Sequence, residues 1–113
     1  MLVFGQGETG ERLASEAERL RALLIDMERI LGGAKPEAIA SGEPAPILDR
    51  WFFGNRASPC LLGLSTNHPK LTGVNRPIAT SDVWLLAADK TWARSLSRWY
   101  RLGRPAERSG LDA

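Results

Sequence analysis

The feature that most constrains the fold is an apolar stripe in the first third of the chain. Its members are spaced alternately by four and three positions: Leu13, Ala17, Leu20, Leu24, Met27 and Leu31. Because residues three and four apart share one face of an α-helix, this spacing predicts a long amphipathic helix over residues 8–32. Gly32 and Gly33 predict its end, since glycine adopts a left-handed cap without strain. We expect the stripe to pack on its own domain, with a homodimer or partner helix as the alternative.

After the helix, the sequence changes from helical to β-rich across a stiff linker. At 113 residues we expect a single domain, with a linker at 33–46, a β-rich part at 47–103 and a mobile tail at 104–113. Runs of β-branched and aromatic residues between turn formers favour strands. The strands predicted in this way span residues 47–53, 59–65 and 78–86, and a turn follows at 87–90.

Residues 90–102 fit two different structures. As a strand, they place Trp92, Leu96 and Tyr100 on one face with arginines between them. As a helix, they align Trp92, Leu96 and Trp99 at spacings of four and three. Serine, tyrosine and tryptophan are mediocre helix formers, which favours the strand.

We therefore predict an α+β fold. One long N-terminal helix packs on a small antiparallel sheet of four or five strands, or on an SH3-like barrel. The alternative is a mostly α-helical domain in which residues 90–102 form a helix. Three consecutive large rings, Trp51, Phe52 and Phe53, are expected mainly to fill the core.

No catalytic or metal-binding motif is evident. Cys60 lies in an apolar run without basic neighbours, which predicts a buried, inert thiol. His68 is the only histidine, and its place before a proline predicts a turn rather than a zinc ligand. Gly5, Gly7 and Gly10 match a dinucleotide fingerprint, but no βαβ unit with a suitably placed acid follows. We expect no cofactor, no metal and no enzymatic activity.

Charge is unevenly divided along the chain. Residues 1–49 contain five Lys/Arg and nine Asp/Glu, a net charge of −4, whereas residues 50–113 contain ten and four, a net charge of +6. Basic and aromatic residues are interleaved near the C-terminal end, which suits binding to phosphates and bases. The candidate binding surface comprises Lys90, Trp92, Arg94, Arg98, Trp99, Arg101, Arg104 and Arg108. Pairing of Arg94 and Arg98 with helix acids such as Glu16 is the alternative.

The C-terminal half also carries an extended motif. It consists of His68-Pro69, Leu71, Gly73, Ile78, Thr80-Ser81, Arg94, Ser97, Tyr100, Leu102 and Gly103. This pattern resembles a domain-of-unknown-function family of short bacterial and phage-borne proteins, which have an N-terminal helix and a W-A-R-x-x-S-R-x-Y-R-L-G ending. The resemblance implies a small β-barrel or curved sheet and an accessory protein of a mobile element. It implies no established activity and no catalytic residues.

These observations lead to two functional expectations. The first is a small non-enzymatic protein-interaction or inhibitor module, which uses the helix stripe or exposed rings to bind an unknown protein or a second copy. The alternative is a nucleic-acid-binding module that uses residues 90–108. No apolar run approaches the ~18 residues that read as a membrane span. The N-terminus lacks the pattern of a secretory signal, so we expect a cytoplasmic protein.

Overall fold

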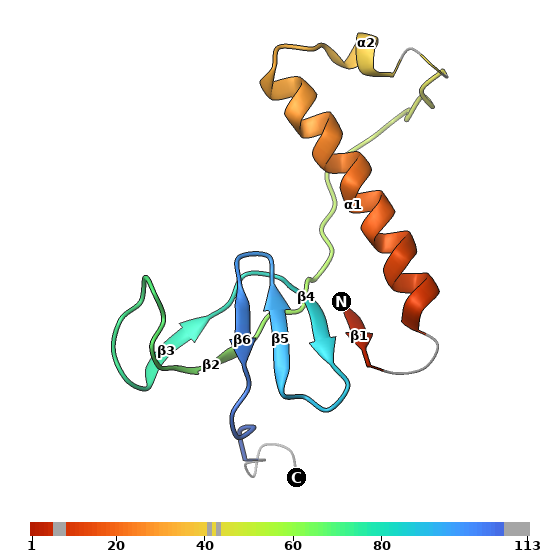
Figure 1. The fold of residues 1–113 in the computed structure, drawn as a ribbon. Helices are drawn as coiled ribbons and strands as arrows, with labels where there is room; N and C mark the ends of the chain where they lie inside the picture. Colours follow the sequence, from red (N-terminus) through yellow and green to blue (C-terminus); the bar gives the residue numbers. More distant parts are fainter. Residues whose placement is uncertain (6–8, 41, 43, 108–113) are drawn as a thin grey trace. The chain divides into compact units, whose positions relative to one another are not determined.

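The computed structural model describes residues 1–5, 9–40, 42 and 44–107, which combine two helices with six short strands (Figure 1). In chain order the elements are β1 (Leu2–Phe4), α1 (Thr9–Leu31), α2 (Pro36–Ile39), β2 (Leu62–Ser65), β3 (Arg76–Ala79), β4 (Val83–Ala87), β5 (Trp92–Ser95) and β6 (Trp99–Arg101). This arrangement confirms the predicted α+β class. The mostly helical alternative is wrong, because residues 92–95 and 99–101 are strands.

Contacts divide the chain into two compact units. The sheet unit contains residues 1–9 and 57–113, and the helix unit contains residues 10–56. The helix unit therefore interrupts the sheet unit in sequence, between β1 and β2. The packing of the helix stripe on the sheet stays a prediction, and so does the single domain.

In the helix unit, α1 ends as the sequence predicts. The N–H groups of Gly32 and Gly33 bond the carbonyl oxygens of Glu28 and Ile30, each at 3.0 Å. Gly33 has φ +93°, the left-handed conformation that glycine adopts without a steric penalty. On the helix surface, Arg19 pairs with Glu16 at 3.1 Å, a spacing that suits neighbouring helix turns.

Residues 47–53 form no strand, so the strand predicted there is wrong. Trp51 and Phe53 meet edge to face, with ring centroids 5.5 Å apart, but 64% and 91% of their surfaces are exposed. Phe52 is 86% exposed, and the prediction that these rings fill the core is therefore also wrong. A strand needs a partner whose backbone groups complete the ladder, and composition alone does not supply one.

The main sheet has the strand order β1-β4-β5-β6. The last three strands are antiparallel neighbours, with Trp92 opposite Arg101 in the final pair. The predicted antiparallel pairing is therefore present, but residues 90–102 form two strands, β5 and β6, where we predicted one. β1, which the sequence did not predict, pairs in parallel with β4, so that Leu2 lies beside Leu85 and Phe4 beside Ala87. The sheet is therefore mixed rather than purely antiparallel.

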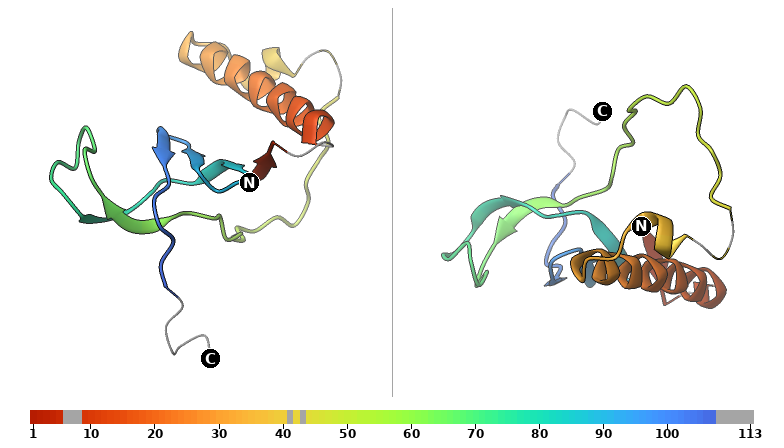
Figure 2. Two further views of the ribbon diagram at one scale, coloured as in Figure 1. Left: turned by 60° about the horizontal axis from the view of Figure 1, so that its bottom comes forward. Right: turned by 90° about the horizontal axis from the view of Figure 1, so that it is seen from above.

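β2 and β3 form a separate antiparallel pair, and the loop that joins them projects from the sheet unit in both views of Figure 2. The single strand predicted over residues 78–86 is in fact parts of β3 and β4. Between them, Thr80 is anchored to Leu61 twice: its N–H donates to the Leu61 carbonyl, and its hydroxyl accepts from the Leu61 N–H, both at 2.9 Å. These bonds extend the β2–β3 pairing by one residue, and the chain enters β4 three residues later, at Val83.

The buried residues of the sheet unit are small, except for His68 in the loop between β2 and β3, which is 9% exposed. Val83, Ala87 and Ala93 have exposed fractions of 4%, 7% and 0%, and Ser95 has 2%. Cys60 lies just before β2 and is exposed, so the prediction of a buried thiol is wrong. Its apolar neighbours in sequence did not imply burial, because this part of the chain is extended and uncovered within its own unit.

Candidate functional site

One face of the main sheet gathers large aromatic and arginine side chains. We call it the aromatic–arginine face and define it by Phe4, Trp92, Arg94, Trp99 and Arg101. Alternation of side chains along β5 and β6 places the four residues of these strands on the same side. We predicted alternating faces for one strand over residues 90–102. In the structure these residues form two strands of a hairpin, so the alternation restarts in β6.

The rings on this face hold one another in place. Trp99 meets Trp92 and Phe4 edge to face, with ring centroids 6.3 Å and 6.0 Å apart. Aromatic pairs favour this geometry, which sets the positive edge of one ring against the negative face of the other. Phe4 comes from β1, so the two outer strands of the sheet contribute rings to one cluster. Trp92 and Trp99 remain 39% and 49% exposed.

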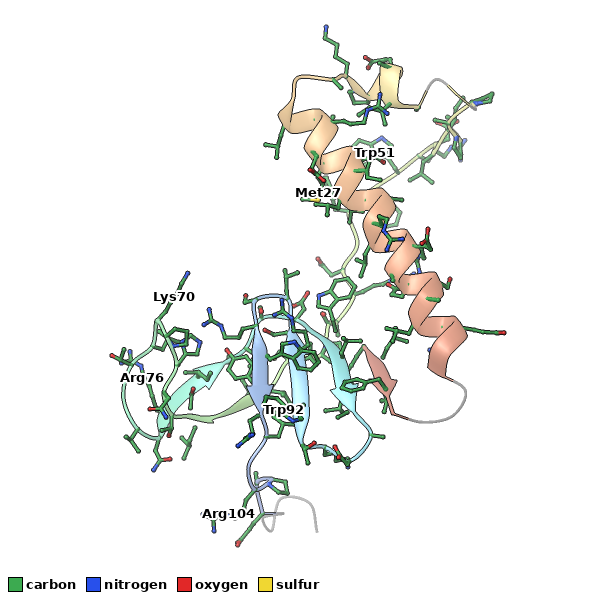
Figure 3. All side chains as sticks on the ribbon, viewed as in Figure 1. Met27, Trp51, Lys70, Arg76, Trp92 and Arg104 are labelled. Carbon is green, nitrogen blue, oxygen red and sulfur yellow. The ribbon has the colours of Figure 1, made fainter. Side chains whose placement is uncertain are left out.

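The two arginines of the face are each held by a contact within the sheet unit. The guanidinium carbon of Arg101 is 5.1 Å from the centroid of the Trp92 ring, which is a cation–π contact (Figure 3 labels Trp92). Arg94 lies opposite Trp99, and its Nη1 donates to the carbonyl of Ser95 at 3.0 Å. The chain therefore orients two cations and two tryptophans without help from a ligand.

Carboxylates are absent from the strands of this sheet. In the described part of the sheet unit, the acids are Asp82, Asp89 and Glu107, and all three lie in turns or after β6. Hydrogen bonds from the Thr91 side chain and backbone lower the pKa of Asp89, so it remains an anion engaged in its own turn. The aromatic–arginine face is thus apolar and cationic.

The other residues of the predicted surface are dispersed. Lys90 lies in the β4–β5 turn and Arg104 follows β6, both exposed. Arg98 is half-buried and lies on the opposite side of the hairpin from Trp99. Arg108 lies outside the described residues. The structure therefore brings together four of the eight predicted residues.

Sequence reasoning missed a second cluster around His68. The His68 Nδ1 accepts the N–H groups of Lys70 and Leu71, each at 3.0 Å, which confirms a turn histidine. Its Nε2 lies 3.2 Å from the Tyr100 hydroxyl, 32 residues away in sequence. Burial lowers the pKa of His68, and the charges of Arg98 and Lys70 lower it further. The C-terminal motif contained both His68 and Tyr100, and their co-occurrence was the available signal.

A serine-rich turn supports this cluster. The Ser95 hydroxyl accepts the N–H groups of Ser97 and Arg98, at 3.2 Å and 3.1 Å, and donates to the Arg98 carbonyl at 3.1 Å. The Ser97 and Ser81 hydroxyls lie 3.0 Å apart, which ties the turn to the segment before β4. These bonds set the direction in which Arg98 and Tyr100 leave the hairpin.

Residues 1–5, 9–40, 42 and 44–107 hold no group of three or more His, Cys, Asp or Glu side chains that could bind a metal ion. Nor does any helix in that part of the chain have the length and apolar character that crossing a bilayer requires.

Comparison with known proteins places the chain in a family. Residues 21–112 match a family of unknown function, DUF6634. The chain belongs to the DUF6634 family. This confirms the prediction that the chain belongs to a family of unknown function. The match begins within α1 and continues beyond β6. No curated protein and no solved structure matches the chain significantly. Because the function of the DUF6634 family is itself unknown, membership assigns the chain no activity.

Proposed function

We propose that this protein is a non-enzymatic protein-interaction module that binds its partner through the aromatic–arginine face. The observation that carries the proposal is the exposure of Trp92 and Trp99 in a cluster whose rings and cations are already oriented. Tryptophan and arginine are the residue types most enriched at energetic hot spots of protein interfaces. Side chains that are held before binding lose less entropy when a partner docks.

The chemistry of the face indicates the kind of partner. Trp92 and Trp99 offer apolar surface, and Arg94 and Arg101 offer positive charge with no carboxylate among them. The complementary surface is an apolar side chain flanked by Asp or Glu. A carboxylate can pair with both N–H groups of a guanidinium, and this contributes specificity as well as affinity.

The helix unit supplies a second apolar surface. Leu23, Leu24, Met27 and Ile30 of α1 are between 49% and 55% exposed. Contiguous exposed apolar side chains of this kind mark interaction surfaces in soluble proteins. An inhibitor encoded by a mobile element, the setting implied by the C-terminal motif, is one form that such a module takes.

A photo-crosslinking residue at position 99 tests the proposal. In cells, we expect a discrete crosslinked protein from position 99 and none from the exposed control position Leu62 on β2. Adding Arg101→Glu should abolish the crosslink, whereas Arg104→Glu, which changes charge equally outside the face, should leave it. Equal crosslinking from both positions, or no effect of Arg101→Glu, would contradict the proposal.

Nucleic-acid binding is the second candidate, favoured by the cationic and carboxylate-free character of the same face. Single-stranded nucleic acids bind surfaces where arginines meet phosphates and rings stack on bases. It ranks second because Arg101 already lies over the Trp92 ring, so a base must displace the guanidinium to stack there. Titration with single- and double-stranded DNA and RNA over a salt series decides this: micromolar binding that weakens steeply with salt supports it, and no binding at low salt rejects it.

A further inference from the structure

The strand β6 lies at an open edge of the main sheet. The strand order is β1-β4-β5-β6, and β2 and β3 pair only with each other. Within the part of the chain that the structure describes, no strand therefore pairs with the outer side of β6. An open edge presents backbone N–H and C=O groups to which another extended segment can bond.

The bonds of the β5–β6 hairpin determine which backbone groups of β6 face outward. The Arg98 carbonyl accepts an N–H from β5 at 2.9 Å, and the Leu102 N–H donates to the residue just before β5 at 2.8 Å. Because backbone groups alternate between the two sides of a strand, those of Trp99 and Arg101 point away from β5. Among the described residues, these outward N–H and C=O groups have no hydrogen-bond partner.

The one charge in β6 is turned away from this edge. Proteins often protect edge strands with charged side chains, which discourage further pairing. Here the guanidinium carbon of Arg101 lies 5.1 Å from the ring of Trp92, its neighbour across the ladder on β5. The cation therefore leans back over the sheet. Trp99 and Arg101 are both exposed, so a partner can reach the edge and the side chains beside it.

We propose that the partner binds through an extended acidic and apolar segment, which adds to β6 as a further antiparallel strand. This inference rests on the proposed function and names how the partner is recognised. Residues directly opposite each other in an antiparallel pair share one face of the sheet. The segment then places a carboxylate opposite Arg101 and an apolar side chain opposite Trp99. Because the two strands run in opposite directions, the carboxylate comes two positions before the apolar residue.

The charge of the edge favours such a segment over a second copy of β6. The sequence of β6 is Trp-Tyr-Arg, which contains no carboxylate. Pairing two copies would bring a second Arg101 to the same face without an acid to balance it, and like charges across a ladder are destabilising. A segment with Asp or Glu supplies the missing anion, and its backbone completes the outward groups of β6 at the same time.

The direct test is an NMR titration of the full-length protein with the blocked peptide Thr-Thr-Glu-Thr-Trp-Thr-Ser. We expect saturable binding, with slower hydrogen exchange of the Trp99 and Arg101 amides in the complex. The Leu102 amide is already bonded in the free protein, so it is the internal control and should exchange slowly throughout. Slow exchange of the Trp99 and Arg101 amides in the free protein, together with a dimer in sedimentation, would overturn the proposal in favour of a second copy.

Methylation of the peptide backbone separates strand addition from other ways of binding. The glutamate and the tryptophan of the peptide lie opposite outward residues of β6, so their own N–H groups point at β6, whereas the N–H of the threonine between them points away. N-methylation of the glutamate or the tryptophan should weaken binding at least tenfold. The same methylation of the central threonine is the matched control and should change the affinity less than twofold.

A variant of the protein tests the acidic position. Arg101→Glu should weaken binding of the peptide at least tenfold, and Arg104→Glu should leave it unchanged. Equal effects of the three N-methylations, or no saturable binding up to millimolar peptide, would overturn strand addition. If the crosslink from position 99 is still obtained in that case, only this inference fails, and the face binds its partner in another way. If that crosslink is absent as well, the proposed function fails with it.

Discussion

The Nε2 of His68 lies 3.2 Å from the Tyr100 hydroxyl, which fixes the β2–β3 loop to the last strand of the main sheet. The same ring accepts two backbone N–H groups of its own loop through Nδ1. Protonation of Nδ1 would remove that acceptor. The neutral form of His68 is therefore part of the fold.

We expect the free energy of unfolding to decrease as the pH falls below 6.5, the ordinary pKa of histidine. Burial, Arg98 and Lys70 lower the pKa of His68 in the folded state. The unfolded chain therefore binds a proton at a higher pH than the folded chain, so acid favours unfolding, and the contribution is fully present above that pH. Urea midpoints between pH 7.5 and 5 measure the effect. A His68→Gln variant, which has no titrating ring, should depend less on pH over this range; an identical dependence would contradict the prediction.

Ser95→Ala should destabilise the protein by about 1–3 kcal/mol, the usual cost of leaving buried groups without a hydrogen-bond partner. The hydroxyl of Ser95 accepts hydrogen bonds from the N–H groups of Ser97 and Arg98, and it donates one to the Arg98 carbonyl. Denaturant unfolding measures the change. Ser58→Ala, at an exposed position before β2, is the matched control and should leave the midpoint unchanged.

Lys90→Gly should stabilise the protein by about 1 kcal/mol, because a left-handed conformation costs L-residues other than glycine roughly that much. Lys90 has φ +60° in the β4–β5 turn, where its N–H donates to the Ala87 carbonyl at 2.9 Å. Thermal unfolding of the variant gives the sign. Lys70→Gly, at a lysine without a positive φ, should give no such gain; a lower melting temperature for Lys90→Gly would show that its side chain matters more than its backbone.

Cys60 should react with a thiol reagent in the native protein almost as fast as in the unfolded chain, because it is exposed. Accessibility limits thiol reactions when a cysteine is buried, and here burial gives no protection. Absorbance of the released thiolate follows the reaction in buffer and in denaturant. Native labelling slowed by a hundredfold or more would mean that the thiol is covered.

The helix was predictable because its signals are local. The stripe from Leu13 to Leu31 and the glycine cap both depend on residues that are close together in the sequence. The predicted helix spans residues 8–32, and α1 spans Thr9–Leu31. The two strands within residues 90–102 were harder to separate. Their turn at Leu96 and Ser97 contains no glycine, proline or asparagine, and it is made instead by the Ser95 side chain.

The remaining errors concern partners that lie far away in sequence. β1 is a three-residue strand whose pairing with β4 joins Phe4 to Ala87, so no local pattern indicates it. Residues 47–53 have the composition of a strand but no partner for its backbone. Within the candidate site, the interleaving of rings and arginines was visible, but which of them share a face depended on the hairpin register.

The interruption of the sheet unit by the helix unit has a consequence for how the protein can vary. Pairing β1 with β4 requires closing the whole intervening chain, and the entropic cost of closure grows only with the logarithm of its length. Doubling that length costs only about 0.6 kcal/mol. The sheet should therefore tolerate helix units of different length, so that one part of the molecule can diversify while the other keeps its register.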